Sequence, residues 1–264
     1  DDTSALDEQE IDVVFIALHG EFGESGEVQQ LCEDSGLVYT GSSPHASLLG
    51  MDKIATKRRA EAIGVPTPQW CRVEEFSDMI ERANYLEGAS LPCVVKPVTG
   101  GSSVGVYICE TQDEREQAVR TLLGEGEEVL VEKCIRGREL TVGILDSEPL
   151  DLLEILPSEG FYDYDAKYAD GTPTQYTFEH GLDAEQVAAI QADAMKVFDA
   201  LGCRDLARVD FMLDEDGNHW LLEINTIPGF TSHSLVPMAA ARSGIEFDDL
   251  VDRLAHMASR RLED

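Results

Sequence analysis

The sequence contains few basic residues. Lys and Arg together number 20, against 52 Asp and Glu, which gives a formal net charge of −32. Such a surface repels nucleic acids and anionic lipids, so neither is an expected partner. The acids are spread along the chain, which favours a solvated surface suited to high salt over an acidic tail or a partner site. A site for a polyphosphate must therefore gather its few cations locally, which makes clustered lysines informative.

Membrane, secretion and disulfide signals are also missing. No apolar stretch reaches the length of about 18 residues that a membrane-spanning helix needs. The first ten residues, DDTSALDEQE, are acidic and polar, unlike a secretory signal peptide, so we expect a cytoplasmic protein. The six cysteines include no CxxC pair and no close Cys/His cluster, which predicts buried free thiols rather than disulfides or zinc.

The hydrophobic pattern predicts an α+β protein. An apolar run rich in Val and Ile at residues 11–18 is typical of a buried parallel strand, and a flexible stretch at 21–26 and a helix at 27–34 follow it. We expect three units, with bounds 1–48, 49–132 and 133–264. The expected elements of the second unit are a helix at 51–64, strands at 69–73, 93–98, 104–109 and 128–131, and helices at 76–86 and 112–122.

The third unit is expected to hold a second set of strands. These are strands at 139–146 and 150–156, a helix at 184–201, a hairpin formed by 208–213 and 220–224, and two C-terminal helices. Residues 157–182 are polar and Tyr-rich, without clear periodicity. A loop this long in a compact domain is more often functional than structural.

A glycine-rich segment, KPVTGGSSVG at residues 96–105, lies between two of the predicted strands. Glycines let a backbone wrap closely around an anion, and successive N–H groups can hold phosphate oxygens. Lys96 ends an apolar strand, where it could reach a phosphate. The segment is not a Walker A loop, and an ordinary hairpin turn explains it equally well.

A second candidate segment follows the strand at 128–131. Residues 132–135, EKCI, pass from a strand into a linker, which can offer backbone groups to an adenine edge. Lys133 could add a cation, and Glu139 could accept hydrogen bonds from ribose hydroxyls. A charged strand end is the alternative interpretation.

Acidic and amide side chains occur at alternate positions in the predicted hairpin. Alternate strand residues share a face, so Arg208 lies with Asp210 and Glu223 lies with Asn225. Their oxygens suit Mg²⁺, and Arg208 could neutralise a developing oxyanion. The alternative is a solvated strand face with a salt bridge.

Three further features complete the candidate set. In TIPGFTSHSL, residues 226–235, Gly229 allows close approach of a substrate and a helix start can bind a carboxylate, although Ser232 or Ser234 could simply cap that helix. The loop FYDYDAKY at 161–168 resembles a lid that brings one lysine to a γ-phosphate. His19 and Lys53 are candidate ligand contacts, with a structural histidine and a solvated helix lysine as alternatives.

These segments occur in a familiar order. HGEFGESG, MDK, VVKPVTGGSSVG, VLVEK, GRELTV, FYDYDAKY, ARVDFML, LLEINTIPG and TSHSLVPMAA resemble the D-alanine–D-alanine ligases of the ATP-grasp superfamily, over nearly the whole chain from Val13. The resemblance implies an ATP-grasp fold, in which two α+β lobes sandwich ATP. It also implies ATP-dependent joining of two D-alanines through an acylphosphate, for peptidoglycan precursor synthesis, and a homodimer formed through the N-terminal lobe.

The resemblance also implies roles for individual residues. ATP would be held by Lys53, Lys96, Gly101, Ser103, Glu132, Lys133, Ile135, Glu139 and Phe161. Mg²⁺, or Mn²⁺, would be held by Asp210, Glu223 and Asn225. The tetrahedral intermediate would be stabilised by Arg208 and the Gly229 N–H, while Lys167 contacts the transferred phosphoryl group. Ser102 and Tyr168 would hold the loop closed, and the D-alanines would be bound by His19, Ser234 and Leu235.

The sequence departs from this family at its start. The family opens with a strand and a glycine-rich segment whose glutamate orients the first D-alanine, and neither precedes Ile11. We therefore expect a truncated α/β N-terminal domain. Three hypotheses follow: an active D-alanyl-D-alanine ligase, an ATP-grasp ligase with another substrate such as D-lactate, or an inactive nucleotide-binding fragment. Tyr168 and the segment SHSLVP argue against the second.

Overall fold

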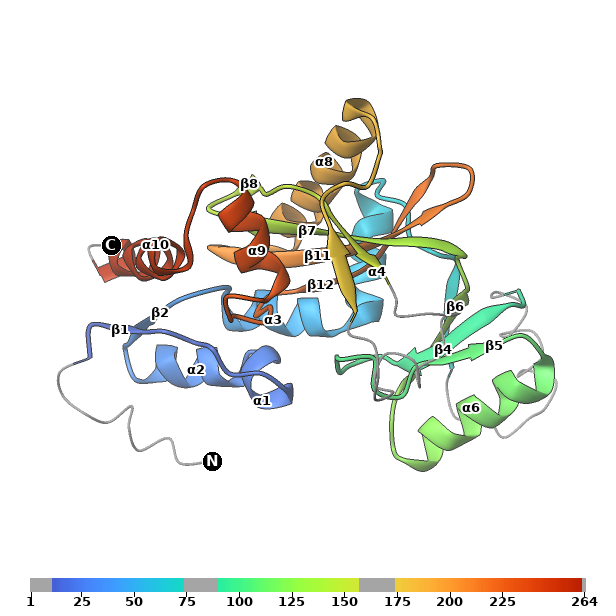
Figure 1. Cartoon of the computed structure of the whole chain (residues 1–264). Helices are drawn as coiled ribbons and strands as arrows, with labels where there is room; N and C mark the ends of the chain where they lie inside the picture. The colour runs from blue at the N-terminus through green and yellow to red at the C-terminus, as the bar shows by residue number, and fades with distance from the viewer. Residues whose placement is uncertain (1–10, 74–89, 157–173, 263–264) are drawn as a thin grey trace.

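The computed structural model describes residues 11–73, 90–156 and 174–262. Within these ranges the strands form three sheets, one in each of three parts of the molecule (Figure 1). A small N-terminal unit lies beside a large sheet, and a smaller sheet, which we call the small lobe, lies on the other side. None of the described helices has the length and apolar character that a membrane span requires.

The N-terminal unit consists of two short strands and two helices. β1 (Val13–Val14) pairs in parallel with β2 (Val38–Tyr39), and α1 (Glu21–Glu24) and α2 (Glu27–Asp34) lie between them in the chain. The predicted strand at 11–18 was too long, because the ladder with β2 spans only two residues. The expected flexible stretch at 21–26 instead contains α1. The predicted helix at 27–34 is confirmed.

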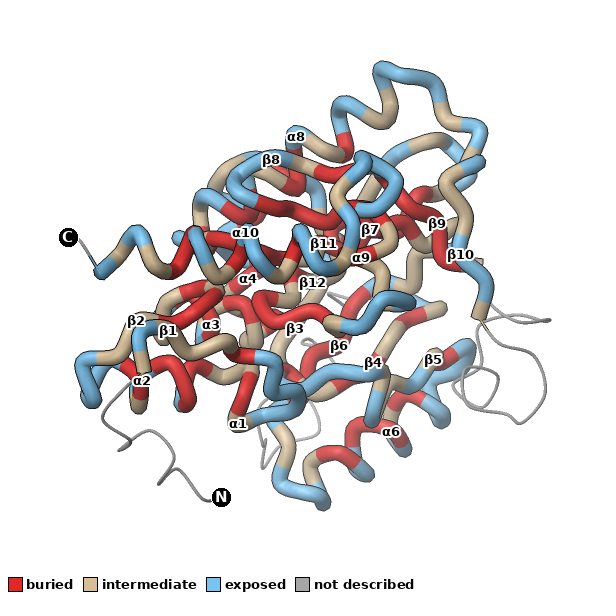
Figure 2. The backbone as a smooth tube through the Cα atoms, turned by 60° about the vertical axis from the view of Figure 1, so that its left-hand side comes forward, coloured by how far each residue is buried: buried red, intermediate tan, exposed pale blue. Residues whose placement is uncertain are grey.

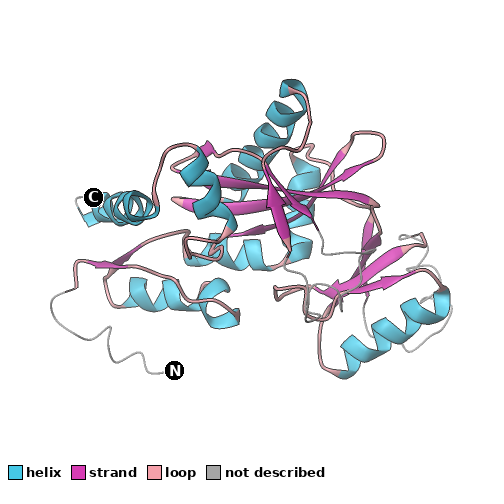
Figure 3. Cartoon of the chain, viewed as in Figure 1, coloured by secondary structure: helices cyan, strands magenta, loops and turns pink. Residues whose placement is uncertain are grey.

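The small lobe is a four-stranded antiparallel sheet covered on one face by a helix (Figure 3). The strand order is β3 (Trp70–Val73), β6 (Val129–Lys133), β4 (Cys93–Pro97), β5 (Tyr107–Cys109). The helix, α6 (Gln112–Gly124), begins at a capping box formed by Thr111 and Glu114. Its apolar side packs on Val95 and Val131. These predicted elements are confirmed within a few residues, and the predicted helix at 76–86 lies outside the described residues.

The large sheet contains the remaining strands, all antiparallel. Its order is β10 (Gln175–Thr177), β9 (Leu153–Leu156), β7 (Gly137–Leu145), β11 (Leu206–Asp214), β12 (His219–Asn225), with β8 (Glu148–Pro149) paired to the end of β7. Of the strand expected at 150–156, only the second half is confirmed, as β9, and β8 lies just before the expected range. The predicted helix at 184–201 is confirmed as α8 (Ala184–Leu201), with Asp183 in a capping box at its start.

The two faces of the large sheet have different roles. One face packs Val142, Val209 and Phe211 against α8, α3 (Pro44–Met51) and α4 (Lys53–Ala62), and Figure 2 shows mostly buried residues along β7 and β11. The other face meets α9 (Leu235–Arg242), where Val236 fills the space beside Gly143. Two further elements, α10 (Phe247–Ser259) and η2 (Arg260–Leu262), pack next to α9. Because strand residues alternate, the neighbours of the core residues point to the α9 side.

The helix α4 contacts both larger parts of the molecule. It starts at Lys53, because the Asp52 carboxylate accepts hydrogen bonds from the N–H groups of Ile54 and Ala55. Its Ala60 lies in the core of the large sheet, whereas Ile54 packs against Leu130 of the small lobe. The helix therefore fixes one lobe against the other. The unit bounds at 48/49 and 132/133 stay predictions.

Candidate active site

The hairpin of β11 and β12 brings four of the predicted residues together. Arg208 lies opposite Asn225, and Asp210 lies opposite Glu223. Their neighbours Val209 and Ile224 are buried in the core on the other face, so these four side chains share the α9 side of the sheet. The alternation inferred from the sequence is therefore confirmed. A bulge follows between Asp210 and Phe211 and ends this register.

Arg208 and Asp210 form a two-pronged ion pair on this face. Arg208 Nε lies 2.9 Å from Asp210 Oδ1 and Nη2 lies 2.7 Å from Oδ2, and Thr141 Oγ1 donates to Oδ1 at 2.6 Å. Asp210 is only 4% exposed, so the alternative of a solvated salt bridge is wrong. Burial acts to lower the pKa of Arg208, but the nearby carboxylates, Asp210 first, outweigh it and raise that pKa. The guanidinium therefore stays charged.

The oxygen atoms on this hairpin fit a partial Mg²⁺ site. Glu223 Oε2 lies 3.8 Å from Lys53 Nζ, and Asn225 Oδ1 accepts a hydrogen bond from the Ile227 N–H at 2.9 Å. In the described ranges no cluster of three or more His, Cys, Asp or Glu could hold a metal ion by itself. Two carboxylates and an amide leave further positions for phosphate and water, which is how Mg²⁺ is commonly bound. The donor set therefore fits the ion.

A cleft connects this hairpin with the glycine-rich segment. It is lined by Glu24, Lys53, Gly100, Gly101, Glu223 and Asn225, among others. Lys53 Nζ donates to the Gly100 carbonyl at 2.6 Å, so the lysine reaches the glycine-rich loop. Burial is the main cause that lowers the pKa of Lys53, with Lys96 acting in the same direction. The solvated-lysine alternative is wrong, because Lys53 is 6% exposed.

The glycine-rich loop joins the antiparallel strands β4 and β5, so it is a hairpin connection, and several of its residues have positive φ values. Gly100 and Gly105 have φ values of 97° and 69°, and Ser102 and Ser103 share the left-handed region at 54° and 59°. Non-glycine residues rarely adopt this conformation without a functional or structural cause. Gly101 lies beside the Glu24 carboxylate of α1, at 3.7 Å from the position that a Cβ would take. Glu24 was missed by the sequence analysis, although it lies within HGEFGESG.

Lys96 and Glu132 are joined in a buried charge cluster. Lys96 Nζ lies 2.5 Å from Glu132 Oε1, and Lys57 Nζ lies 2.6 Å from Oε2. Burial acts to raise the pKa of Glu132, but Lys57 and Lys96 outweigh it and lower that pKa to about 2. The carboxylate of Glu132 is therefore buried between two lysines, and the alternative of a charged strand end is wrong for this residue. Lys57 was also missed, because a lysine in a polar helix gives no sign of burial.

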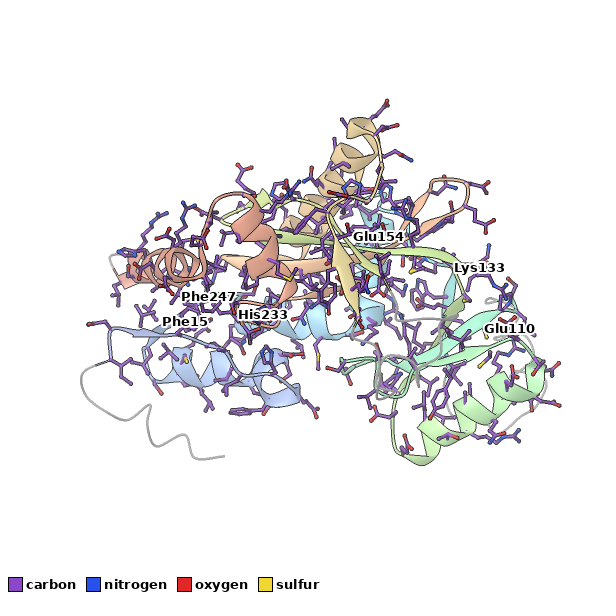
Figure 4. All side chains as sticks on the ribbon, in the orientation of Figure 1. Phe15, Glu110, Lys133, Glu154, His233 and Phe247 are labelled. Carbon is purple, nitrogen blue, oxygen red and sulfur yellow. The ribbon has the colours of Figure 1, made fainter. Side chains whose placement is uncertain are left out.

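The residues after β6 lie where the small lobe passes into the large sheet. Lys133 is exposed at the end of β6, and Figure 4 shows it at this passage; its N–H donates to the Gln69 carbonyl at 2.8 Å. Ile135 is half-buried. Glu139 lies on β7 opposite Met212, two residues before Thr141, and therefore shares the Asp210 side of the sheet.

The segment after β12 forms a tight turn before α9. A Cβ on Gly229 would lie 3.1 Å from Ser234 Oγ, and that oxygen accepts the Thr231 N–H at 3.0 Å. Ser234 precedes α9, yet within the described residues its side chain caps no N–H of the helix. The capping alternative is therefore wrong for Ser234, whose hydroxyl closes the turn. Leu235 is the first residue of α9 and is half-buried.

Some of the remaining predicted residues do not line the cleft. The His19 side chain is about half exposed, and its Nδ1 lies 3.5 Å from Glu24 Oε1, so it reaches the cleft through Glu24. Figure 4 places His233 between α9 and the N-terminal unit, near Phe15 and Phe247. Phe161, Lys167 and Tyr168 lie outside the described residues.

Comparison with known proteins identifies the family. The family model described as D-ala D-ala ligase C-terminus matches residues 60–256, and the model of the N-terminus matches residues 2–42. The chain belongs to the D-alanine–D-alanine ligase family. It is 45% identical to the D-alanine–D-alanine ligase of Saccharophagus degradans over 91% of this chain and 75% of that protein. It is 42% identical to that of Syntrophotalea carbinolica over 97% of this chain and 82% of the relative.

Solved structures of family members agree with the fold. The D-alanine–D-alanine ligase from Bacillus anthracis complexed with ATP superposes with a TM-score of 0.82 at 35% identity, over 96% of this chain and 81% of that one. The enzyme from Coxiella burnetii gives 0.81 at 29% identity, over 95% and 68% of the two chains. The predicted α+β, ATP-grasp architecture of this family is thereby confirmed.

Proposed function

We propose that the protein joins two D-alanines into D-alanyl-D-alanine and converts ATP to ADP and phosphate. The observation that carries this proposal is the cleft in which Lys53 and the loop at 100–105 meet the hairpin residues Glu223 and Asn225. Cations and open backbone suit a polyphosphate, and oxygen ligands suit its metal ion. The family relationship, at 40–45% identity, supports the same substrates.

ATP is proposed to lie between the small lobe and the large sheet. Lys53 and Lys96 supply positive charge for its phosphates, and the backbone around Gly101 and Ser103 supplies N–H donors. Glu132 holds Lys96 in place rather than binding the nucleotide directly. The adenosine is proposed to contact Lys133, Ile135, Glu139 and, outside the described residues, Phe161. The relative from Bacillus anthracis, solved with ATP, supports this placement.

Mg²⁺ is proposed to be held by Asp210, Glu223 and Asn225, with Mn²⁺ as a substitute. When bound, it neutralises phosphate charge and orients the oxygens for transfer. The protein's own part is to fix the carboxylates: Arg208 and Thr141 orient Asp210, and Lys53 lies beside Glu223.

The proposed reaction has two steps. The carboxylate of the first D-alanine attacks the γ-phosphorus, which releases ADP and leaves an acylphosphate. The amine of the second D-alanine attacks the acyl carbon, loses a proton, and expels phosphate to form the peptide bond. No protein nucleophile is needed, because phosphorylation activates the carboxylate and electrostatics stabilise the charge.

Residues near the reacting atoms are proposed to act on charge and position. Arg208 and the Gly229 N–H stabilise the oxyanion of the tetrahedral intermediate. Ser234 and Leu235 position the second D-alanine at the start of α9, and His19 contacts the first. Lys167 contacts the transferred phosphoryl group, while Ser102 and Tyr168 hold the loop closed.

The assay that tests this proposal measures ADP release in the presence of different candidate substrates. D-alanine should stimulate ADP release, whereas D-lactate and L-amino acids should not. Activity restricted to a pair other than D-alanine would replace the proposal by another ATP-grasp ligase. ATP binding without any D-alanine-dependent turnover would support the inactive nucleotide-binding alternative.

The cellular setting is proposed from the same activity. D-alanyl-D-alanine is a peptidoglycan precursor, so we place the protein in the cytoplasm and in cell-wall synthesis, with small molecules as its partners. A homodimer is proposed from the family resemblance. Light scattering of the purified protein tests the mass, and a monomer at micromolar concentration would contradict the dimer.

A further inference from the structure

Lys57 is a fully buried lysine that the proposed reaction does not use. It lies on α4 with a side-chain exposure of 0%, and its ammonium has two close partners. Nζ lies 2.6 Å from Glu132 Oε2 and donates to Thr67 Oγ1 at 2.7 Å. Removing an ammonium from water is costly, so a lysine retained at such a position needs a strong compensating interaction.

The charge count of this cluster is unusual. Glu132 alone could be neutralised by Lys96, whose Nζ lies 2.5 Å from its other oxygen. Adding Lys57 leaves two ammonium groups on one carboxylate, and hence an excess buried positive charge. In a chain with a net charge of −32 this excess is not a general property of the composition. An anion bound in the adjoining cleft would balance it.

Lys57 also connects the two lobes. Glu132 is on β6 of the small lobe, whereas Thr67 Oγ1 donates to the carbonyl of Leu221 on β12 of the large sheet at 3.0 Å. Leu221 lies two residues before Glu223 on the candidate metal hairpin. Through Thr67, one ammonium thus links Glu132, the partner of Lys96, to the strand that holds Glu223.

We propose that Lys57 is a positioning residue for ATP: by sharing the charge of Glu132, it leaves Lys96 with net positive charge to direct at the nucleotide phosphates. The inference rests on the proposed function in one respect, namely that ATP is the ligand of the cleft. Lys57 itself does not touch the nucleotide in this proposal.

The test compares ATP affinity in Lys57→Met with that of the intact chain, by calorimetry without D-alanine. Methionine keeps most of the volume of the side chain and removes its charge. The dissociation constant for ATP should rise about tenfold or more, as expected for the loss of a charge-assisted interaction. Lys196→Met, which removes a half-exposed lysine paired with Asp193, is the matched control and should bind ATP like the intact chain. An unchanged ATP affinity in Lys57→Met would overturn the proposal.

Two further measurements separate positioning from a general loss of structure. If Lys57 acts through Lys96, the weakening should be large for ATP and small for adenosine, which has no phosphate. The double variant K57M/E132Q removes both Lys57 and Glu132, so it should recover part of the ATP affinity lost in Lys57→Met, because Lys96 is then no longer neutralised by the carboxylate. Equal weakening of ATP and adenosine, or a double variant that binds ATP no better than Lys57→Met, would contradict the proposal.

The two proposals fail in different experiments. The ligase proposal fails if the intact chain shows no D-alanine-dependent ADP release. The Lys57 proposal is tested by comparing the ATP affinity of the variants with that of the intact chain. Its outcome therefore does not depend on whether the chain joins D-alanines.

Discussion

Arg208 and Asp210 are held together at two points, with Nε 2.9 Å from Oδ1 and Nη2 2.7 Å from Oδ2, on the side of the large sheet that faces the cleft. The pair fixes the direction of a guanidinium that would otherwise rotate, and also the oxygens of a proposed metal ligand. The orientation of the guanidinium and that of the Asp210 oxygens thus depend on the same ion pair. Because the pair lies on the hairpin of the candidate active site, we expect substitution of either residue to change turnover more than ATP binding.

Substitution of Arg208 should lower turnover more than ATP binding. Arg208→Met removes the charge proposed to stabilise the oxyanion, so kcat should fall by about 100-fold or more, while the dissociation constant for ATP changes little. Steady-state kinetics and calorimetry measure the two quantities. Arg120→Met is the control, because Arg120 is exposed on α6 and pairs with Glu116 of the same helix. A large loss of ATP affinity with unchanged kcat would contradict the proposed role.

Substitution of the proposed metal ligands should raise the requirement for Mg²⁺. Asp210→Asn and Glu223→Gln each remove one charged oxygen ligand, so the Mg²⁺ concentration for half-maximal activity should rise about tenfold or more. A Mg²⁺ titration at saturating ATP measures this. Asp216→Asn, in the exposed turn between β11 and β12, should leave the titration unchanged. Identical curves for all variants would exclude the hairpin as the metal site.

A methyl group at Gly229 should disturb the second substrate. The new Cβ would lie 3.1 Å from Ser234 Oγ, so the serine must shift by a few tenths of an ångström. Gly229→Ala should therefore lower kcat/KM for the second D-alanine by about tenfold, with ATP affinity preserved. Gly124→Ala, near the end of α6 with open space around it, is the matched control. Steady-state kinetics over a wide range of D-alanine concentrations measure this effect. Unchanged KM and kcat in Gly229→Ala would contradict the prediction.

The buried carboxylate of Glu132 should make stability depend on acid pH. Lys57 and Lys96 overcome the effect of burial and lower its pKa from 4.5 to about 2 in the folded protein. A carboxyl with a lowered folded pKa stabilises the protein above its unfolded pKa, and this contribution is lost as the pH falls from 4.5 towards 2. The intact chain should therefore exceed Glu132→Gln in free energy of unfolding by about 3 kcal/mol at pH 6, and the gap should close towards pH 2.

Urea denaturation at a series of pH values measures that gap. Glu128→Gln serves as the control, because Glu128 is exposed and pairs with Arg72 at the surface. A gap for Glu132→Gln that stays constant down to pH 2 would mean that the carboxylate is not stabilised by the two lysines.

Periodicity predicted the elements whose partners are close in sequence. The helix α8 has a capping residue, an amphipathic face and a terminal Gly202, so its bounds followed from local signals. The hairpin residues Arg208 and Asp210 were also placed correctly, because the alternation of strand residues fixes which side chains share a face. Much of the candidate site was therefore accessible from the sequence.

The sequence could not show what depends on distant partners. β1 is short because β2 offers it only two paired residues, which no local pattern reveals. Lys57 lies in KIATKRRAEA, a polar helix, and becomes buried only because Glu132 and Thr67 meet it from other parts of the chain. Glu24 reaches the glycine-rich loop for the same reason. Tertiary contacts, rather than propensity, decided these positions.

The proposed ligase activity is tested most directly by mixing the purified 264-residue chain with ATP, Mg²⁺ and D-alanine and measuring D-alanyl-D-alanine by chromatography alongside ADP. We predict one dipeptide for each ADP, with both products absent when D-alanine is omitted. ADP without dipeptide, or binding of ATP without either product, would contradict the proposed activity.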